Sequence, residues 1–194
     1  FTMLPNAGYN PDDGIMVGLS PTYTFNGFDR KPFSSRHTVN LNYYFATKGF
    51  EAKYKGSYLK AIGKWNLDIN GRYTSPTFST NFFGLGNETE NRQKELGMDY
   101  NRVRQESYSV GPSVYKIFRN NGRLDFFANY NYIRVEENID RIVTQSSDVN
   151  SEVFRGQNFT EAGAKYLYRN YDNESLPTLG MTFSGIAKWV TNNE

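Results

Sequence analysis

The 194-residue chain contains no cysteine and only one histidine, His37. Without cysteine, the chain has neither a disulfide framework nor a thiolate metal site. No stretch approaches the ~20 consecutive apolar residues that a membrane-spanning helix requires, which excludes a helical membrane protein. A formal net charge of +2 lacks the basic excess that follows nucleic-acid phosphates. We therefore expect no nucleic acid among its partners.

The chain is polar on average but rich in aromatic residues. Its mean hydropathy is -0.69, yet it contains 15 Tyr, 15 Phe and 2 Trp. Such an aromatic content is not typical of a disordered chain, because the rings need apolar surroundings. The contrast favours elements with one apolar side and one wet side.

Hydrophobicity alternates with a period of two along most of the chain, and no segment sustains a period of 3.6. The clearest alternation has Trp65, Leu67 and Ile69 on one side and Asn66, Asp68 and Asn70 on the other. No helix is needed to account for the pattern. Eight strands are predicted at 15–25, 38–45, 50–58, 65–74, 107–114, 124–132, 161–169 and 181–189, with residues 1–9 as a ninth.

The alternation fits an all-β transmembrane antiparallel barrel, whose strands need about 9 to 11 residues and have one lipid-facing and one lumen-facing side. The polar sides carry ions such as Lys53, Lys55, Asp68, Arg72, Glu161, Lys165 and Arg169, which are costly in a dry core and tolerated in a wet lumen. We expect pairs such as Glu51/Lys53 and Glu161/Lys165 to fill the lumen or to line a conduction path. Aromatic residues gather toward the strand ends, where interfacial girdles are expected. The predicted lipid-facing residues are Val17, Leu19, Tyr43, Phe45, Trp65, Leu67, Ile69, Tyr108, Val110, Phe126, Tyr130, Tyr166, Phe183 and Trp189.

Loop lengths indicate the topology. Outer-membrane barrels have long extracellular loops and short periplasmic turns, so the long loops at 75–99 and 136–158 are predicted to be extracellular. The strand at 15–25 must then run inward, after residues 1–9 have carried the chain outward and residues 11–14 have formed a tight turn. Nine is an odd number of strands, whereas complete bacterial single-chain barrels have an even number. We therefore expect further strands outside residues 1–194.

Two other folds give the same alternation. One is a soluble antiparallel β domain with one wet face. The other is a small autonomous eight-stranded barrel, which counts only the strands after residue 14. Residues 1–10 have neither an initiator Met nor the regions of a signal peptide, which favours mature protein or an excised piece.

Three short segments resemble the bacterial surface antigen family, the BamA/TamA-type outer-membrane assembly factors. They are Gly8-Tyr-Asn-Pro-Asp-Asp-Gly14, Phe82-Phe-Gly-Leu-Gly-Asn-Glu-Thr89, and Asp172-Asn173 followed by Leu176-Pro-Thr-Leu-Gly180. The third is the most specific. The matching positions are Gly8, Tyr9, Pro11, Asp12, Asp13, Gly14, Gly84, Gly86, Asn87, Asp172, Asn173, Pro177, Thr178 and Gly180.

The resemblance implies that residues 1–194 form the N-terminal half of a sixteen-stranded barrel in the Gram-negative outer membrane, preceded by periplasmic domains. It implies a protein that inserts or translocates outer-membrane proteins, or one that anchors or exports a fused phosphoesterase or lipase domain. The implied partners are outer-membrane lipid, lipopolysaccharide and other envelope proteins or client barrels. The family's Arg-Gly-Phe motif belongs to the second half of the barrel, and Arg155-Gly156 lies in the wrong loop to represent it. Pro5 and Gly8 weaken pairing of the first strand, either at an opening seam or at a frayed end.

No residue set indicates an enzyme, a cofactor or a metal site. No Ser/His/Asp arrangement is present around His37, which we expect to have a structural role near a strand end. Asp12 and Asp13 are predicted turn residues, because the further oxygen ligands of a calcium site are missing. The segment 84–86 lacks the strand-to-helix context of a phosphate loop. The mixed charges Glu88, Glu90, Arg92, Lys94, Glu95 and Asp99 favour a solvated loop or a contact with lipopolysaccharide or a partner protein.

Overall fold

The computed structural model describes residues 1–28, 30–86, 92–97, 99–119, 121–147, 149–173 and 175–193. The fold is all-β, with 64% strand and 6% helix, as predicted. The strands are β1 (Thr2–Asn10), β2 (Gly14–Phe25), β3 (Ser35–Tyr44), β4 (Gly49–Ile62), β5 (Trp65–Thr74), β6 (Ser79–Asn81), β7 (Arg102–Ile117), β8 (Gly122–Val135), β9 (Gln157–Tyr171) and β10 (Gly180–Asn192). The helical turns are α1 (Gln93–Leu96), α2 (Ile142–Gln145) and η1 (Ser151–Phe154).

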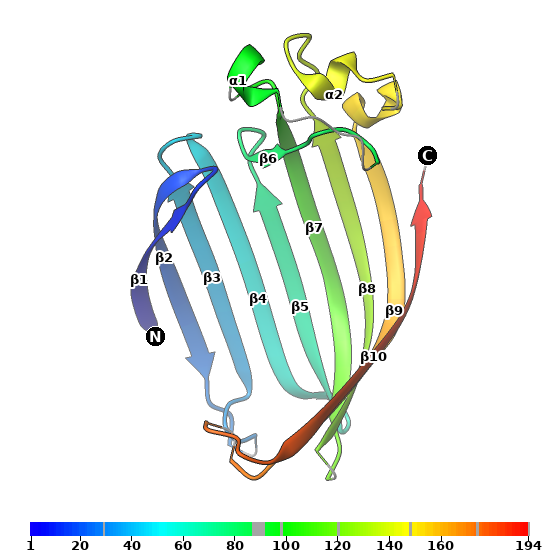
Figure 1. The fold of residues 1–194 in the computed structure, drawn as a ribbon. Coiled ribbons are helices and arrows are strands. Elements are labelled where there is room, and N and C mark those ends of the chain that lie inside the picture. The colour runs from blue at the N-terminus through cyan, green and yellow to red at the C-terminus, as the bar shows by residue number, and fades with distance from the viewer. Residues whose placement is uncertain are drawn as a thin grey trace.

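All strands belong to one antiparallel sheet in the order β1-β2-β3-β4-β5-β7-β8-β9-β10, with β6 paired to β7 (Figure 1). Each long strand therefore pairs with its neighbours in the chain. These strands do not close into a barrel, and β1 and β10 are the two edges. Because β1 and β10 are the first and the ninth of a series of strands with alternating direction, they run in the same direction and cannot pair antiparallel with each other.

The structure adds one strand and three helical turns to the nine predicted strands. Strand β6 has only 3 residues, too few for alternation to be visible in the sequence. The helical turns have 4 residues each and lie in the two long connections, so they show no helical period either. Within the described residues, no helix has the length and apolar character needed to cross a membrane.

The strand register places all eight predicted apolar sets on one side of the sheet. Residues directly opposite each other on paired strands point to the same side. Leu19 is opposite Leu41, and Leu41 is opposite Ala52. From Ala52 the same row continues across β5 and β7 through Tyr73 and Tyr108. We call this side the apolar face and the opposite side the polar face.

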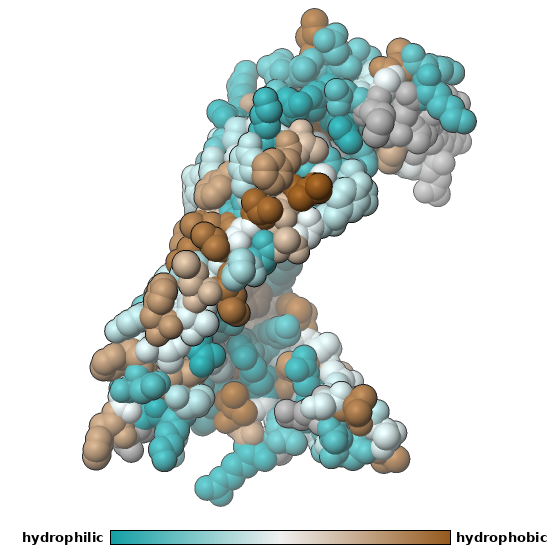
Figure 2. All heavy atoms as spheres, turned by 90° about the vertical axis from the view of Figure 1, so that its left-hand side faces the viewer, coloured by the Kyte–Doolittle hydropathy of each residue, from teal (hydrophilic) through white to brown (hydrophobic). Residues whose placement is uncertain are grey.

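The two faces differ in exposure, and the apolar side chains are more exposed than the carboxylates of the polar face. On the apolar face, Leu19 and Trp189 are 45% and 63% exposed, whereas Glu51 and Asp68 on the polar face are 3% and 5% exposed. Side chains converge on the concave side of a curved sheet, so these values make the polar face the concave one. Seen from the β1 side, hydrophobic side chains form a band along the sheet and hydrophilic ones dominate the upper end (Figure 2).

The connections divide into two ends. At the loop end lie the turns at 11–13 and 45–48 together with the long connections 75–101 and 136–156; at the turn end lie 26–34, 63–64, 118–121 and 172–179 (Figure 1). The prediction that both long loops share one side is confirmed. They also contact each other, because the Ile142 N–H donates to the Tyr100 carbonyl at 2.9 Å and Arg141 Nη1 donates to the Arg102 carbonyl at 2.7 Å.

Candidate functional site: the polar face and its two ends

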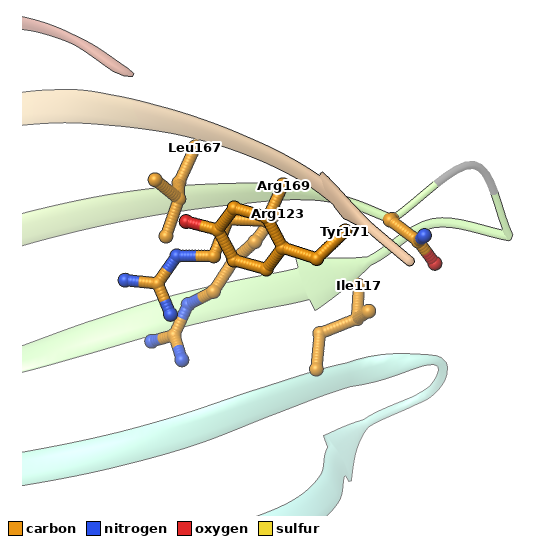
Figure 3. A pocket seen from close by; sticks show the side chains of 6 residues that line it. Ile117, Arg123, Leu167, Arg169 and Tyr171 are labelled. Carbon is orange, nitrogen blue, oxygen red and sulfur yellow. The ribbon is translucent and has the colours of Figure 1, made fainter. Parts of the chain in front are cut away.

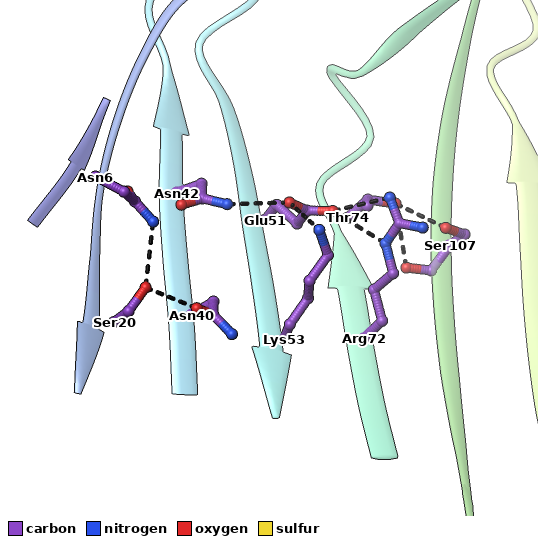
Figure 4. A network of polar contacts seen from close by, with 9 residues as sticks. All are labelled: Asn6, Ser20, Asn40, Asn42, Glu51, Lys53, Arg72, Thr74 and Ser107. Atoms are coloured by element: carbon purple, nitrogen blue, oxygen red, sulfur yellow. Dashed lines mark hydrogen bonds and ion pairs between the residues drawn. The ribbon is translucent and has the colours of Figure 1, made fainter. Parts of the chain in front are cut away.

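A buried carboxylate organises the centre of the polar face (Figure 4). Glu51 accepts from Asn42 Nδ2 at 3.1 Å, and its oxygens lie 2.9 Å from Lys53 Nζ and 2.8 Å from Arg72 Nη2. We call these four residues the Glu51 cluster. The Lys53 and Arg72 side chains remain 44% and 56% exposed, so the charge of a nearly inaccessible carboxylate is balanced by cations that reach water.

Further ion pairs continue along the polar face. Lys55 Nζ lies 3.6 Å from Asp68 Oδ2, and Lys188 Nζ lies 3.2 Å from Glu161 Oε2. The Glu51–Lys53 pair predicted from the sequence is present, but the predicted partner of Glu161, Lys165, is wrong. Residues four apart on a strand are separated by about 13 Å, whereas Lys188 lies on the adjacent strand β10.

Uncharged polar side chains extend this hydrogen bonding toward both sides (Figure 4). Asn6 Nδ2 donates to Ser20 Oγ at 3.2 Å, and Ser20 Oγ donates to Asn40 Oδ1 at 2.6 Å. On the other side, the hydroxyls of Thr74 and Ser107 lie 2.7 Å apart. Three separate groups of polar side chains thus link each pair of neighbouring strands from β1 to β7.

A pocket of about 440 Å³ lies on the polar face at the turn end, lined by Ile117, Asn121, Arg123, Leu167, Arg169 and Tyr171 (Figure 3). Arg123 is held by Asp125, with Nη2 and Oδ1 2.5 Å apart. Arg169, predicted to face a lumen, forms no ion pair with another described residue. The pocket therefore presents positive charge beside apolar walls, a combination that suits an anion. The Arg123–Asp125 ion pair is not among the predicted contacts. The sequence does contain a sign of it, because residues i and i+2 of a strand lie on the same face of the sheet.

Aromatic side chains cluster near both ends of the apolar face. Toward the loop end, Tyr43 meets Phe45 edge-on at 5.2 Å between ring centroids, and Tyr108 stacks on Tyr132 at 4.8 Å. Toward the turn end, Trp65 lies 5.9 Å from Phe126. The other predicted lipid-facing residues share this face through the strand register.

The single histidine belongs to the turn-end cluster. His37 Nδ1 lies 2.9 Å from the Tyr54 hydroxyl, and the imidazole meets the Tyr58 ring edge-on at 5.4 Å. Among the described residues, no group of three or more His, Cys, Asp or Glu side chains is placed to hold a metal ion.

The first motif segment builds the turn between β1 and β2. Gly8 and Tyr9 lie in β1, Pro11–Asp13 form the turn, and Gly14 begins β2. Asn10 Nδ2 donates to Asp13 Oδ2 at 2.7 Å, and Asn81 Nδ2 donates to Asp12 Oδ1 at 3.0 Å. Burial raises the pKa of the Asp13 carboxyl. These contacts attach the first turn to β6 at the loop end.

The third motif segment forms the connection between β9 and β10. The Asp172 carboxylate accepts from the Thr178 hydroxyl and from the backbone N–H groups of Leu179 at 3.0 Å, Thr178 at 3.1 Å and Asn173 at 2.9 Å. The Thr178 hydroxyl hydrogen bond, followed by these backbone bonds, lowers the pKa of Asp172 to about 2. Asp172, Asn173 and Thr178 therefore act together to fix one turn.

Gly180 completes this turn at the start of β10, three residues after Pro177. A Cβ atom at position 180 would lie 2.5 Å from Tyr171 Cδ1 and 2.6 Å from the Asn170 carbonyl oxygen. No larger residue fits there without a backbone shift, which accounts for a glycine at this point of the motif.

The second motif segment is described only as far as residue 86. Gly84 and Gly86 lie between β6 and α1, with φ angles of 110° and 94°. Asn87, together with Glu88 and Glu90, lies outside the described residues. Lys94 and Glu95 lie in α1, and Asp99 is 3.5 Å from Arg102.

The chain matches no protein-family model, no curated protein and no solved structure.

Proposed function

We propose that this chain forms part of the wall of a transmembrane β-barrel in the outer membrane of a Gram-negative bacterium, with its apolar face toward lipid and its polar face toward a wet lumen. The observation that carries the proposal is the missing hydrophobic core. Among the described residues, the buried hydrophobic side chains are Val103, Tyr115 and Val143. In lipid, the exposed side chains of the apolar face are covered, and the ions of the polar face keep contact with water.

Strand geometry supports the same arrangement. The long strands have 9 to 16 residues, enough to cross a bilayer at the usual tilt. The edges β1 and β10 would leave unpaired backbone groups in lipid, so both must pair with further strands. Since the edges run in the same direction, an odd number of antiparallel strands closes the ring. Nine strands plus an odd number gives the even total of bacterial single-chain barrels.

The two ends of the sheet suggest an orientation. We place the long connections of the loop end outside the cell and the Asp172 turn in the periplasm, since outer-membrane barrels have long loops outside and short turns inside. The aromatic clusters then lie near the two membrane interfaces, in contact with lipid and lipopolysaccharide.

We infer that the barrel inserts or translocates other outer-membrane proteins, as its resemblance to BamA/TamA-type factors implies. The edge strand β1 supports this activity. The Phe45 N–H donates to the Ile15 carbonyl, so odd residues of β2 bond toward β3 and even residues toward β1. Pro5 is opposite Leu19, and its nitrogen therefore points away from β2. Proline removes a donor only from the free edge, which weakens closure there and favours exchange with a client strand.

Depletion of the intact protein in its own bacterium tests the activity. We expect the amounts of other outer-membrane barrels to fall and to recover when the wild-type gene is restored. Normal amounts of those barrels after depletion would contradict the insertion function. If a fused enzyme activity disappeared from the cell surface at the same time, the anchoring alternative would be favoured instead.

A further inference from the structure

A second polar pocket, of about 400 Å³, lies at the loop end between the turn at 45–48 and the β6–β7 pair. Its charged lining residues are Lys48, Arg102, Arg104 and Asp99, and its hydroxyl groups include that of Ser79. Ser79 is opposite Arg104 in the β6–β7 register, so both residues belong to the same side of the sheet. The lining thus has three cationic side chains and the Asp99 carboxylate, and the buried Asp13 carboxylate interacts with Thr47, Ser79 and Arg102 of this lining.

The two arginines are only loosely paired. Arg102 Nη1 lies 3.5 Å from Asp99 Oδ1, and Arg104 Nη1 lies 3.9 Å from Glu136 Oε1. Charge-assisted hydrogen bonds are about 2.7 to 2.9 Å long, as at the 2.8 Å contact of Arg72 with Glu51. The guanidinium groups of Arg102 and Arg104 therefore keep donors for an anionic ligand.

Ser79 is an independent sign of a ligand. The residue is 9% exposed, and its Oγ has no hydrogen-bond partner among the described residues. A buried hydroxyl without a partner is uncommon and unfavourable in folded proteins. A phosphoryl group is a suitable partner, because its oxygens accept from a hydroxyl and from two guanidinium groups together.

The position of the pocket indicates where the phosphoryl group comes from. Arg102 and Arg104 have the same strand parity as Tyr108, whose ring belongs to the loop-end aromatic cluster of the apolar face. Arg104 is four residues from Tyr108, which corresponds to about 13 Å along the strand. If the apolar face contacts lipid, this places the pocket just beyond the aromatic girdle, at the depth of the headgroups.

We propose that this pocket binds the phosphoryl group of an anionic lipid in the outer leaflet, of the kind that lipopolysaccharide carries. The inference rests on the proposed membrane orientation and goes beyond it by assigning a lipid site to Lys48, Ser79, Arg102 and Arg104.

The test compares binding of diphosphorylated lipid A and of inorganic phosphate to the intact purified protein in neutral detergent, measured by native mass spectrometry and calorimetry. We expect Arg104→Gln to weaken lipid A binding about tenfold or more, and Ser79→Ala to weaken it several-fold. The matched control is Lys64→Gln, which removes an exposed cation at the turn end and should leave binding unchanged.

Unchanged lipid A affinity in both pocket variants would overturn the proposal. Inorganic phosphate binding as tightly as lipid A, with the same losses in the variants, would overturn the lipid as the ligand. If Arg104→Gln fails to fold, the lipid A affinity of Ser79→Ala tests the proposal instead. This substitution removes only the hydroxyl oxygen, so the variant is expected to fold. Failure of the membrane orientation would be detected separately, by water access to the apolar face, whatever the lipid A result.

Discussion

Asp172 and Thr178 are joined twice, because both the hydroxyl and the backbone N–H of Thr178 donate to the Asp172 carboxylate. The backbone N–H of Leu179 adds a further donor at 3.0 Å. One carboxylate therefore closes the connection between β9 and β10 and sets the chain direction into the edge strand. This structural role explains the spacing between the Asp-Asn and Pro-Thr parts of the motif.

The first prediction concerns the pH dependence of this turn. The folded pKa of Asp172, about 2, lies below its ordinary value of 3.8. A lowered carboxyl pKa stabilises the turn above about pH 4, and this stabilisation is lost as the pH falls through about 2. We expect the hydrogen-exchange protection factors of the Thr178 and Leu179 amides to follow that loss. Asp172→Asn should lose this protection already at pH 7, whereas exposed Asp140→Asn should keep it; unchanged protection in Asp172→Asn would disprove the role of the carboxylate.

The second prediction concerns the Glu51 cluster. Glu51→Gln keeps the size of the side chain but leaves Lys53 and Arg72 without their shared counter-charge. We expect a loss of about 1–3 kcal/mol in the free energy of unfolding, below the full value for a buried pair because both cations reach water. Urea unfolding of the intact protein in detergent measures it. Glu137→Gln at an exposed position is the control, and equal stability of the two variants would argue against a structural role for the cluster.

The third prediction concerns close packing between β1, β2 and β3. A Cβ atom on Gly18 would lie 2.2 Å from Asn6 Oδ1 and 2.5 Å from the Leu41 carbonyl oxygen. Gly18→Ala should therefore destabilise the protein by about 1–3 kcal/mol. The same substitution at Gly185 meets no atom within 4 Å and serves as the control. If Gly18→Ala were as stable as Gly185→Ala, the atoms of β1 and β3 around Gly18 would have to lie further away than these two distances.

The strands that could be predicted from the sequence are those whose alternation continues through the sheet. The predicted strand 65–74 matches β5 at both ends, because hydrophobic and polar residues alternate without interruption there. Strand β7 begins five residues earlier than predicted, since Arg102, Arg104 and Glu106 occupy the apolar-face positions beyond Tyr108. Because these three side chains are charged, hydrophobic and polar residues do not alternate in this part of the sequence, and the start of β7 could not be predicted.

Contacts between strands were harder to predict than the strands themselves. The partner of Glu161 is Lys188 on β10, which only the sheet register brings close. The loop-end pocket draws Lys48 from the β3–β4 turn, Ser79 from β6 and Arg104 from β7. No spacing within one strand indicates such a grouping, because it depends on how β6 extends the sheet beside β7.

The most direct test of the membrane proposal uses two neighbouring positions on β5. The chain has no cysteine, so each introduced cysteine is unique within it. Ile69→Cys lies on the apolar face and Asn70→Cys on the polar face; each is spin-labelled in the intact protein in lipid bilayers. Collision rates with oxygen, which concentrates in lipid, and with a water-soluble nickel complex are then compared. If the apolar face contacts lipid and the polar face contacts water, position 69 has high oxygen and low nickel access and position 70 has the reverse. High nickel access at position 69 would contradict the membrane proposal.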